Sequence, residues 1–244
     1  MQLGHESLAL VGLIVVLAYT VVGTTGFGAS ITSVPLLVHI LPLTSVVPMM
    51  VVLDLCAGML IVGRNFRSVQ RGELFRLLPF MLAGIALGVT LLVSAPERLL
   101  LLSLGIAVLC YAVWSLWGRA PSGPIAPAWS APLGTVGGIF SALFGTGGPV
   151  YTIYLARRIE DKGRLRATIS TLIFLSALAR LVALLVAGVY RSDLLLLIAL
   201  MVPCMLLGLY AGSRLHHRLP ARQVIRIIWS LLLVSSTSLI WRSL

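Results

Sequence analysis

Long apolar runs follow one another along almost the whole 244-residue chain, and they constrain its fold more than any other feature. A helix needs about 20 apolar residues to cross the hydrocarbon core of a bilayer. We identify ten apolar segments, at residues 8–25, 29–41, 45–63, 75–93, 99–117, 129–145, 149–156, 167–189, 194–213 and 224–241. Only 10% of the residues are charged, against about 25% in soluble domains. The sequence therefore predicts an all-α polytopic membrane protein.

Two of these segments, 29–41 and 149–156, are too short to cross a bilayer alone. Each follows a glycine-rich break, at residues 23–28 and 144–149. Pro149 is expected at the first position of its short helix, where a missing N–H is tolerated. We predict that each short segment forms a hairpin with the segment before it and returns to the side from which the hairpin started.

The two halves of the chain repeat one another. At a shift of 124 residues, glycines, prolines and an arginine coincide: Pro79 with Pro203, Gly84 with Gly208, Gly88 with Gly212, Pro96 with Pro220, and Arg98 with Arg222. At a shift of 117, Phe27 and Gly28 coincide with Phe144 and Gly145. We predict two membrane repeats, residues 1–117 and 129–244, joined by a linker at 118–128. Each repeat is a short glycine-broken helical hairpin plus three transmembrane helices.

Basic residues predict the orientation of the repeats. The net charge is +11, but the basic residues lie in short loops, which indicates topology signals rather than nucleic-acid binding. With hairpins that return to their starting side, 14 basic residues fall on one side: Arg64, Arg67, Arg71, Arg76, Arg119, Arg157, Arg158, Lys162, Arg164, Arg166, Arg214, Arg218, Arg222 and Arg226. Only Arg98, Arg191 and Arg242 fall on the other. This split favours inverted-topology repeats with both termini outside. Eight helices with parallel halves would put loops 64–76 and 156–166 on opposite sides.

The glycine breaks are candidate substrate sites. Transporters with inverted repeats often bind substrate near the midplane, where broken helices aim their N-termini at anionic groups. The predicted substrate-binding residues in the breaks are Gly26, Gly28 and Ser30, and Gly145, Thr146, Gly147 and Gly148. We expect the two breaks to approach one another at mid-membrane. The paired glycines Gly84, Gly88, Gly208 and Gly212 are instead expected to serve close helix packing.

Two charges lie inside apolar segments of corresponding position in the two halves. Asp54 lies in 45–63 and Arg180 in 167–189. Each costs at least ~2.5–3.5 kcal/mol in lipid, so both should face the protein interior or a cavity. Arg180 is predicted to bind an anionic substrate. Asp54 is predicted to bind a coupling proton or to release Arg180 as substrate leaves. A purely structural Asp54–Arg180 pair is the alternative.

Several stretches resemble the TauE/SafE family of membrane transporters, over essentially the whole chain. They are the break and short helix at residues 23–37, the second break at 138–149, and the helix from Arg166 to Leu181, which includes Arg180. The first break departs from the family by having Phe27, Ala29 and Ser30 in place of a run of glycines. The family's threonine-serine pair is also absent at the start of the third segment, where residues 45–50 stand. The resemblance implies ion-coupled export of sulfite or small organosulfonates across the bacterial inner membrane by alternating access.

Other functions remain open at this point. A carrier of thiosulfate or of a metal cation is one alternative, although a cation carrier should show several intramembrane acids and Asp54 is the single one in the apolar segments. A membrane-embedded enzyme or a non-transporting scaffold are others. No HExxH, GxSxG or GxxxxGK[ST] pattern is present, so no enzyme activity, cofactor or metal site is predicted. The expected partners are a small anion and membrane lipid, not nucleic acid, with monomer and homodimer both possible.

Cysteine labelling tests the inverted topology. Single cysteines placed in loops 64–76 and 156–166, in a variant without Cys56, Cys110 and Cys204, should react with an impermeant maleimide from the same side. That side should be the cytoplasm, because basic loops stay inside. Labelling of the two loops from opposite sides would favour the parallel arrangement of eight helices.

Overall fold

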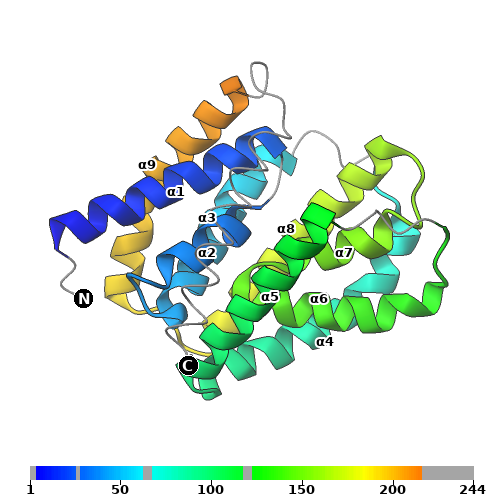
Figure 1. Cartoon of the computed structure of the whole chain (residues 1–244), viewed down its shortest axis with the longest axis horizontal. Coiled ribbons are helices and arrows are strands. Elements are labelled where there is room, and N and C mark those ends of the chain that lie inside the picture. Colours follow the sequence, from blue (N-terminus) through cyan, green and yellow to red (C-terminus); the bar gives the residue numbers. More distant parts are fainter. Residues whose placement is uncertain (1–3, 26–27, 63–67, 118–122, 216–244) are drawn as a thin grey trace. The chain divides into compact units, whose positions relative to one another are not determined.

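The computed structural model describes residues 4–25, 28–62, 68–117 and 123–215 (Figure 1). These residues form α1 His5–Thr25, α2 Ala29–Leu37, α3 Leu43–Val62, α4 Arg71–Ser94, α5 Glu97–Trp117, the short 3-10 helix η2 Pro127–Trp129, α6 Ser130–Phe144, α7 Gly147–Leu155, α8 Lys162–Val186 and α9 Ser192–Leu215. No strand occurs within these ranges. The predicted all-helical class is confirmed for this part of the chain. The last predicted segment, 224–241, lies outside the described residues.

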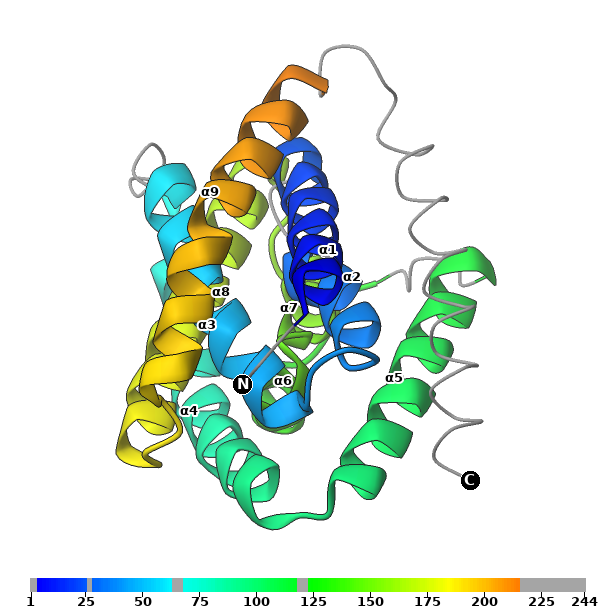
Figure 2. The same cartoon turned by 90° about the vertical axis from the view of Figure 1, so that its left-hand side faces the viewer.

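The chain divides into two compact units, and each contains helices from both halves of the sequence. Unit 1 comprises residues 1–53, 95–119 and 191–244, and unit 2 comprises 54–94 and 120–190. In unit 1, α1 lies along α9 (Figure 2). In unit 2, α4 lies along α6. In both units, therefore, a helix from the first half of the chain packs against one from the second half.

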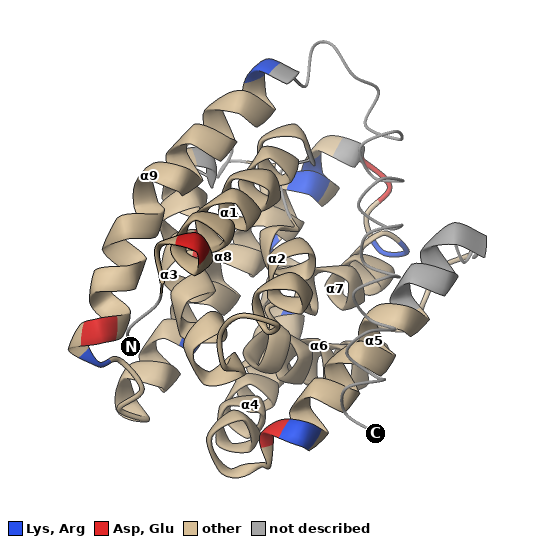
Figure 3. Ribbon diagram, turned by 60° about the vertical axis from the view of Figure 1, so that its left-hand side comes forward, with Lys and Arg blue, Asp and Glu red and all other residues tan. Residues whose placement is uncertain are grey.

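Five described helices are long and apolar enough to cross a membrane: α1, α3, α4, α8 and α9. Charged residues lie mostly near helix ends, and most of the length of these helices carries none (Figure 3). The helices α2 and α7 have nine residues each, which gives a length of about 14 Å. That is less than half the ~30 Å hydrocarbon core. The prediction that these two segments are too short to cross alone is confirmed.

Glycines on α4 let its backbone touch that of α6. A Cβ atom at Gly84 would overlap the carbonyl oxygen of Thr135 and lie 3.0 Å from the Cα of Gly138. A Cβ atom at Gly88 would lie 2.9 Å from the carbonyl oxygen of Ile139. Small residues at such a crossing allow the close backbone approach that stabilises helix pairs in lipid. The packing role predicted for Gly84 and Gly88 is confirmed.

Glycines on α9 do the same against α1 in unit 1. A Cβ atom at Gly208 would lie 2.5 Å from the carbonyl oxygen of Val16. One at Gly212 would overlap the carbonyl oxygen of Thr20. The packing role predicted for these two glycines is also confirmed.

The two helix crossings match each other residue by residue. The glycines of one crossing stand 124 residues after those of the other, Gly208 after Gly84 and Gly212 after Gly88. The backbone oxygens that they meet also keep one spacing of 119 residues, from Val16 to Thr135 and from Thr20 to Ile139. Both units therefore contain an equivalent helix pair, as an internal repeat would produce.

The residues at the start of α4 and those after α7 lie at the same end of unit 2. The backbone N–H of Gln70 donates to Thr168 Oγ1 at 2.9 Å. Arg158 Nη2 lies 2.7 Å from Glu73 Oε1, and its Nη1 donates to the carbonyl oxygen of Ile125 at 3.3 Å. The described parts of the basic loops 64–76 and 156–166 therefore meet, and residues 63–67 lie outside the described ranges.

Alanine at two glycines of α4 tests the helix crossing. Gly84→Ala should lower the thermal stability of the purified protein by the equivalent of about 1–3 kcal/mol, because the new methyl group overlaps the α6 backbone. Gly72→Ala is the matched control, since a Cβ atom there meets nothing within 4 Å. Thermal unfolding in detergent measures both. Equal melting temperatures for the two variants would contradict the close crossing.

Candidate functional site

The helix α6 ends at a break inside unit 2. Its C-cap, Gly145, has φ 72°, a left-handed conformation that glycine adopts without steric penalty. The N–H of Gly145 donates to the carbonyl oxygen of Ser141 at 2.8 Å, and the N–H of Thr146 donates to that of Phe140 at 3.3 Å. These bonds satisfy carbonyl groups at the end of α6, as in a left-handed helix cap.

The helix α7 begins at once after this break. Thr146 is its N-cap, and Gly147, Gly148 and Pro149 are its first three residues. Pro149 is thus the third helical residue and not the first, so that prediction is wrong. The hydroxyl of Thr146 donates to the Phe140 carbonyl oxygen at 3.5 Å. The N–H groups of the first turn have no partner within the helix, and the helix dipole makes this end positive.

Tyr151, one turn into α7, is completely buried. Two glycines provide the space for its ring. A Cβ atom at Gly137 of α6 would overlap the ring carbon Cε1, and one at Gly147 would lie 3.0 Å from Cε2. The glycines around the break therefore hold an aromatic ring as well as shaping the backbone.

One face of α8 points toward this break. Ser141 Oγ of α6 and Ser176 Oγ of α8 lie 2.6 Å apart, and both serines are buried. A Cβ atom at Gly148 would lie 3.4 Å from Ile173 Cδ1. Residues 173, 176 and 180 follow the spacing i, i+3, i+7, which places them on one face of a helix. Arg180 therefore lies on the face that carries Ser176.

Arg180 is 3% exposed. Its guanidinium is close enough to Tyr151 and Tyr190 to interact electrostatically with both hydroxyls. Tyr190 lies between α8 and α9. Burial raises the pKa of Tyr190 to about 12, and the Arg180 charge acts in the opposite direction, so this phenol is neutral at physiological pH.

Asp54 of α3 and Arg180 of α8 lie at similar heights along the axes of these two neighbouring helices. A Cβ atom at Gly58 of α3 would lie 3.0 Å from Phe174 Cδ2 of α8. Gln70, eight residues after the end of α3, donates its N–H to Thr168 near the start of α8, so the end of α3 lies toward the start of α8 and the two helices are antiparallel. Asp54 lies four residues before Gly58, or about 6 Å along the axis, and Arg180 six residues after Phe174, or about 9 Å in the same direction. Asp54 is half-buried.

The first break lies in unit 1. Gly28 is the N-cap of α2 with φ 103°, Ser30 is buried in the first turn of α2, and Gly26 lies outside the described residues. Of the predicted site residues, Arg180 lies on the face of α8 that meets α6 at Ser141 and α7 at Gly148. That the two breaks meet stays a prediction.

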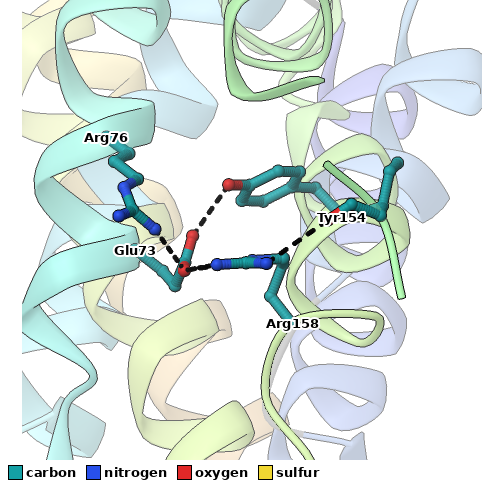
Figure 4. Close-up of polar contacts among 5 residues, drawn as sticks. Glu73, Arg76, Tyr154 and Arg158 are labelled. Atoms are coloured by element: carbon teal, nitrogen blue, oxygen red, sulfur yellow. Dashed lines mark hydrogen bonds and ion pairs between the residues drawn. The ribbon is translucent and has the colours of Figure 1, made fainter. Parts of the chain in front are cut away.

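A charged cluster at one end of unit 2 was not predicted from the sequence (Figure 4). Glu73 at the start of α4 is 5% exposed. Its Oε2 accepts from the Tyr154 hydroxyl at 2.7 Å, and its Oε1 accepts from Arg158 Nε and Nη2 at 3.1 and 2.7 Å and from Arg76 Nη1 at 2.8 Å. The hydrogen bonds to Glu73 raise the pKa of Arg158. The cluster ties the end of α7 to the start of α4.

Sequence reasoning also missed Tyr151, Ser141 and Ser176. The serines do carry a weak signal, because Ser176 precedes Arg180 by four residues and Ser141 precedes Gly145 by four. Residues four apart share a helix face. Tyr151 carries none, since aromatic residues are common in apolar helices.

The fold and this site define a class of protein. They combine membrane-length helices, a short helix that starts at a half-buried glycine break, and a buried arginine on the neighbouring helix. This combination is typical of helical membrane transporters.

Comparison with known proteins identifies the family. A family model described as "Sulfite exporter TauE/SafE" matches residues 11–239. The chain is also 29% identical over 203 residues to "Probable inner membrane transporter protein TsaS" of Comamonas testosteroni, a match that covers 80% of this chain and 83% of that protein. No solved structure matches the chain. The chain belongs to the TauE/SafE family of transmembrane transporters and is an integral inner membrane protein.

Two arginine substitutions test the charged cluster. Arg158→Gln should destabilise the protein by about 2–3 kcal/mol, because it leaves the buried Glu73 carboxylate without its two-pronged donor. Arg76→Gln should cost no more than about 1 kcal/mol, since the Arg76 side chain is 49% exposed. Thermal unfolding of both variants in detergent provides the measurement. An equal loss for both would show that Arg158 does not hold α7 to α4.

Proposed function

We propose that this protein is a secondary transporter that exports a small sulfur oxoanion, such as sulfite, or an organosulfonate across the inner membrane. Export is coupled to a proton or ion gradient and proceeds by alternating access. The observation that carries the proposal is the buried Arg180, which lies on the face of α8 turned toward the break between α6 and α7.

Electrostatics favour an anion at this break. A buried guanidinium and the positive end of α7, equivalent to about half a charge, both attract negative charge. A metal cation would meet repulsion from both, so the cation alternative is disfavoured. An oxoanion also offers several acceptor oxygens to the planar fork of donors on arginine.

The remaining site residues follow from this geometry. The backbone N–H groups of Gly147 and Gly148 bind substrate oxygens, because the first turn of α7 leaves them without helical partners. Gly145 and Thr146 shape the break. Gly26, Gly28 and Ser30 form the corresponding substrate site at the first break.

Asp54 is the coupling group in this proposal. Its position along α3 is level, to within about 3 Å, with that of Arg180 along the neighbouring α8. With its proton released, the carboxylate attracts the guanidinium and competes with a bound anion. With a proton bound, Asp54 is neutral and no longer competes with the substrate for Arg180. Binding of a proton therefore favours binding of the anion.

The repeat arrangement is part of the proposal. Residues 1–117 and 129–244 form inverted repeats around the linker 118–128. Two observations support this: the equivalent glycine crossings in the two units, and the meeting of the basic segments at residues 70–73 and 158 at one end of unit 2. Parallel halves would place those segments on opposite sides of the membrane.

The family description names sulfite as the exported substrate, and this is the support for sulfur among the anions. The name of the relative from Comamonas testosteroni describes an inner membrane transporter. For this chain, the structure supports an anion through Arg180, and the family supplies the sulfur chemistry.

Anion flux in proteoliposomes tests the function. Wild-type protein should move sulfite or a simple sulfonate along an imposed gradient, and Arg180→Ala should reduce that flux at least about tenfold, because it removes a charge-assisted contact. Arg180→Lys should retain part of the flux. Arg191→Ala, at an exposed position after α8, is the matched control and should transport normally.

The same assay separates the two parts of the assignment. Normal sulfite flux by Arg180→Ala would show that the site lies elsewhere. No anion flux by the wild-type protein under any gradient would contradict the transport proposal itself. Asp54→Asn should still exchange anions but lose the response to a pH gradient, and an unchanged response would remove Asp54 from coupling.

A further inference from the structure

We infer that Tyr151 contacts the substrate: its hydroxyl, with the Ser141–Ser176 pair, donates hydrogen bonds to the oxygen atoms of the anion whose charge Arg180 balances. This inference rests on the proposed function and extends it. It assigns the recognition of the oxygen atoms to neutral hydroxyl groups and the recognition of charge to the arginine. The substrate class is then an anion with an exposed sulfonyl-type group of several oxygens, as in sulfite and sulfonates.

The Tyr151 hydroxyl lacks a well-formed hydrogen bond. It is completely buried, and neither of its nearest polar neighbours, the hydroxyls of Ser141 and Ser176, lies in full hydrogen-bond geometry with it. Such groups are rare in native proteins and destabilise them, so each calls for an explanation. A ligand oxygen that accepts from this hydroxyl would satisfy it.

The Tyr151 hydroxyl also lies among other polar groups. It lies beside the hydroxyls of Ser141 and Ser176 and within electrostatic range of Arg180. Its ring fills the space left by Gly137 and Gly147, whose backbones leave no room for a Cβ. The ring is therefore fixed in place before any ligand arrives, which reduces the entropy lost on binding.

The serine pair adds a further donor. Two hydroxyls carry two protons, and the 2.6 Å bond between Ser141 and Ser176 uses one of them. The second proton can be donated to a third group, either the neighbouring Tyr151 oxygen or an oxygen of the bound anion. Together with Tyr151, the pair thus offers up to two neutral O–H donors on the side of α8 that carries Arg180.

Neutral donors suit a transporter. Another buried cation would hold an anion too strongly for release and would be costly in the empty state. Hydroxyls add direction and specificity without adding charge, so the site binds an oxoanion without a second buried cation.

Two tyrosines of α7 give a matched test. Tyr151→Phe should weaken the binding of sulfite and of methanesulfonate by about 10- to 100-fold, because a hydrogen bond to a charged acceptor is lost. Tyr154→Phe, one turn further along α7 and bonded to Glu73, should change both affinities less than about twofold. Isothermal titration of the detergent-purified full chain measures each affinity.

The thermal stability of the two variants distinguishes a substrate-binding role of Tyr151 from a purely structural one. Without anion, Tyr151→Phe should raise Tm by about 2–4 °C, because it removes a buried hydroxyl that has no partner in full hydrogen-bond geometry. Tyr154→Phe should lower Tm. Higher stability with weaker binding in Tyr151→Phe is the expected pattern.

Two results would overturn the inference. One is an unchanged affinity of Tyr151→Phe for both anions, and the other is a lower Tm without anion, which would mean that the hydroxyl has a structural partner. Either can occur while the wild-type protein still binds sulfite, which would leave the proposed function intact. Absence of sulfite and methanesulfonate binding by the wild-type protein would contradict the proposed function as well.

Discussion

A break in a helix at membrane depth depends on the protein that surrounds it, because lipid cannot hydrogen-bond the freed backbone groups. At the second break, the end of α6 satisfies its own carbonyls through Gly145 and Thr146. The first turn of α7 is left with N–H groups that have no helical partner. Those donors lie among the close contacts of α6, α7 and α8.

The enclosure is built from small residues. Gly84 and Gly88 bring α4 against α6, while Gly137 and Gly147 admit the Tyr151 ring. Ser141 and Ser176 join α6 to α8 through hydroxyls. Around the break, small residues therefore serve close packing, and the two serines also add hydroxyl groups to the candidate site.

Sequence patterns predicted the helices well because apolar segment length and glycine breaks are local signals. The short helices α2 and α7, the glycine crossings and the burial of Arg180 all follow from the composition of single segments. The surroundings of Tyr151 could not be predicted, because they include Ser176 and Arg180 of another helix. The Glu73 cluster could not be predicted either, because Arg158 lies 85 positions from Glu73. Only the packing of distant segments reveals such contacts.

The repeat was visible in the sequence through glycine and proline, and the structure gives these matches a physical reason. The matched glycines are the points where backbones touch, so substitution there is penalised in both halves. The charged residues, in contrast, differ between the two halves of the repeat. Arg180 corresponds in segment to Asp54, and a cation in one half thus corresponds to an anion in the other.

The central claim is that a small anion binds at the break between α6 and α7. The most direct measurement is a structure of the protein with selenite, a heavier analogue of sulfite, located by anomalous scattering. The account predicts a selenium peak with its oxygens within hydrogen-bond distance of the Gly147 or Gly148 N–H and of Arg180. A selenium peak elsewhere in the protein, or none at a concentration that saturates binding, would contradict it.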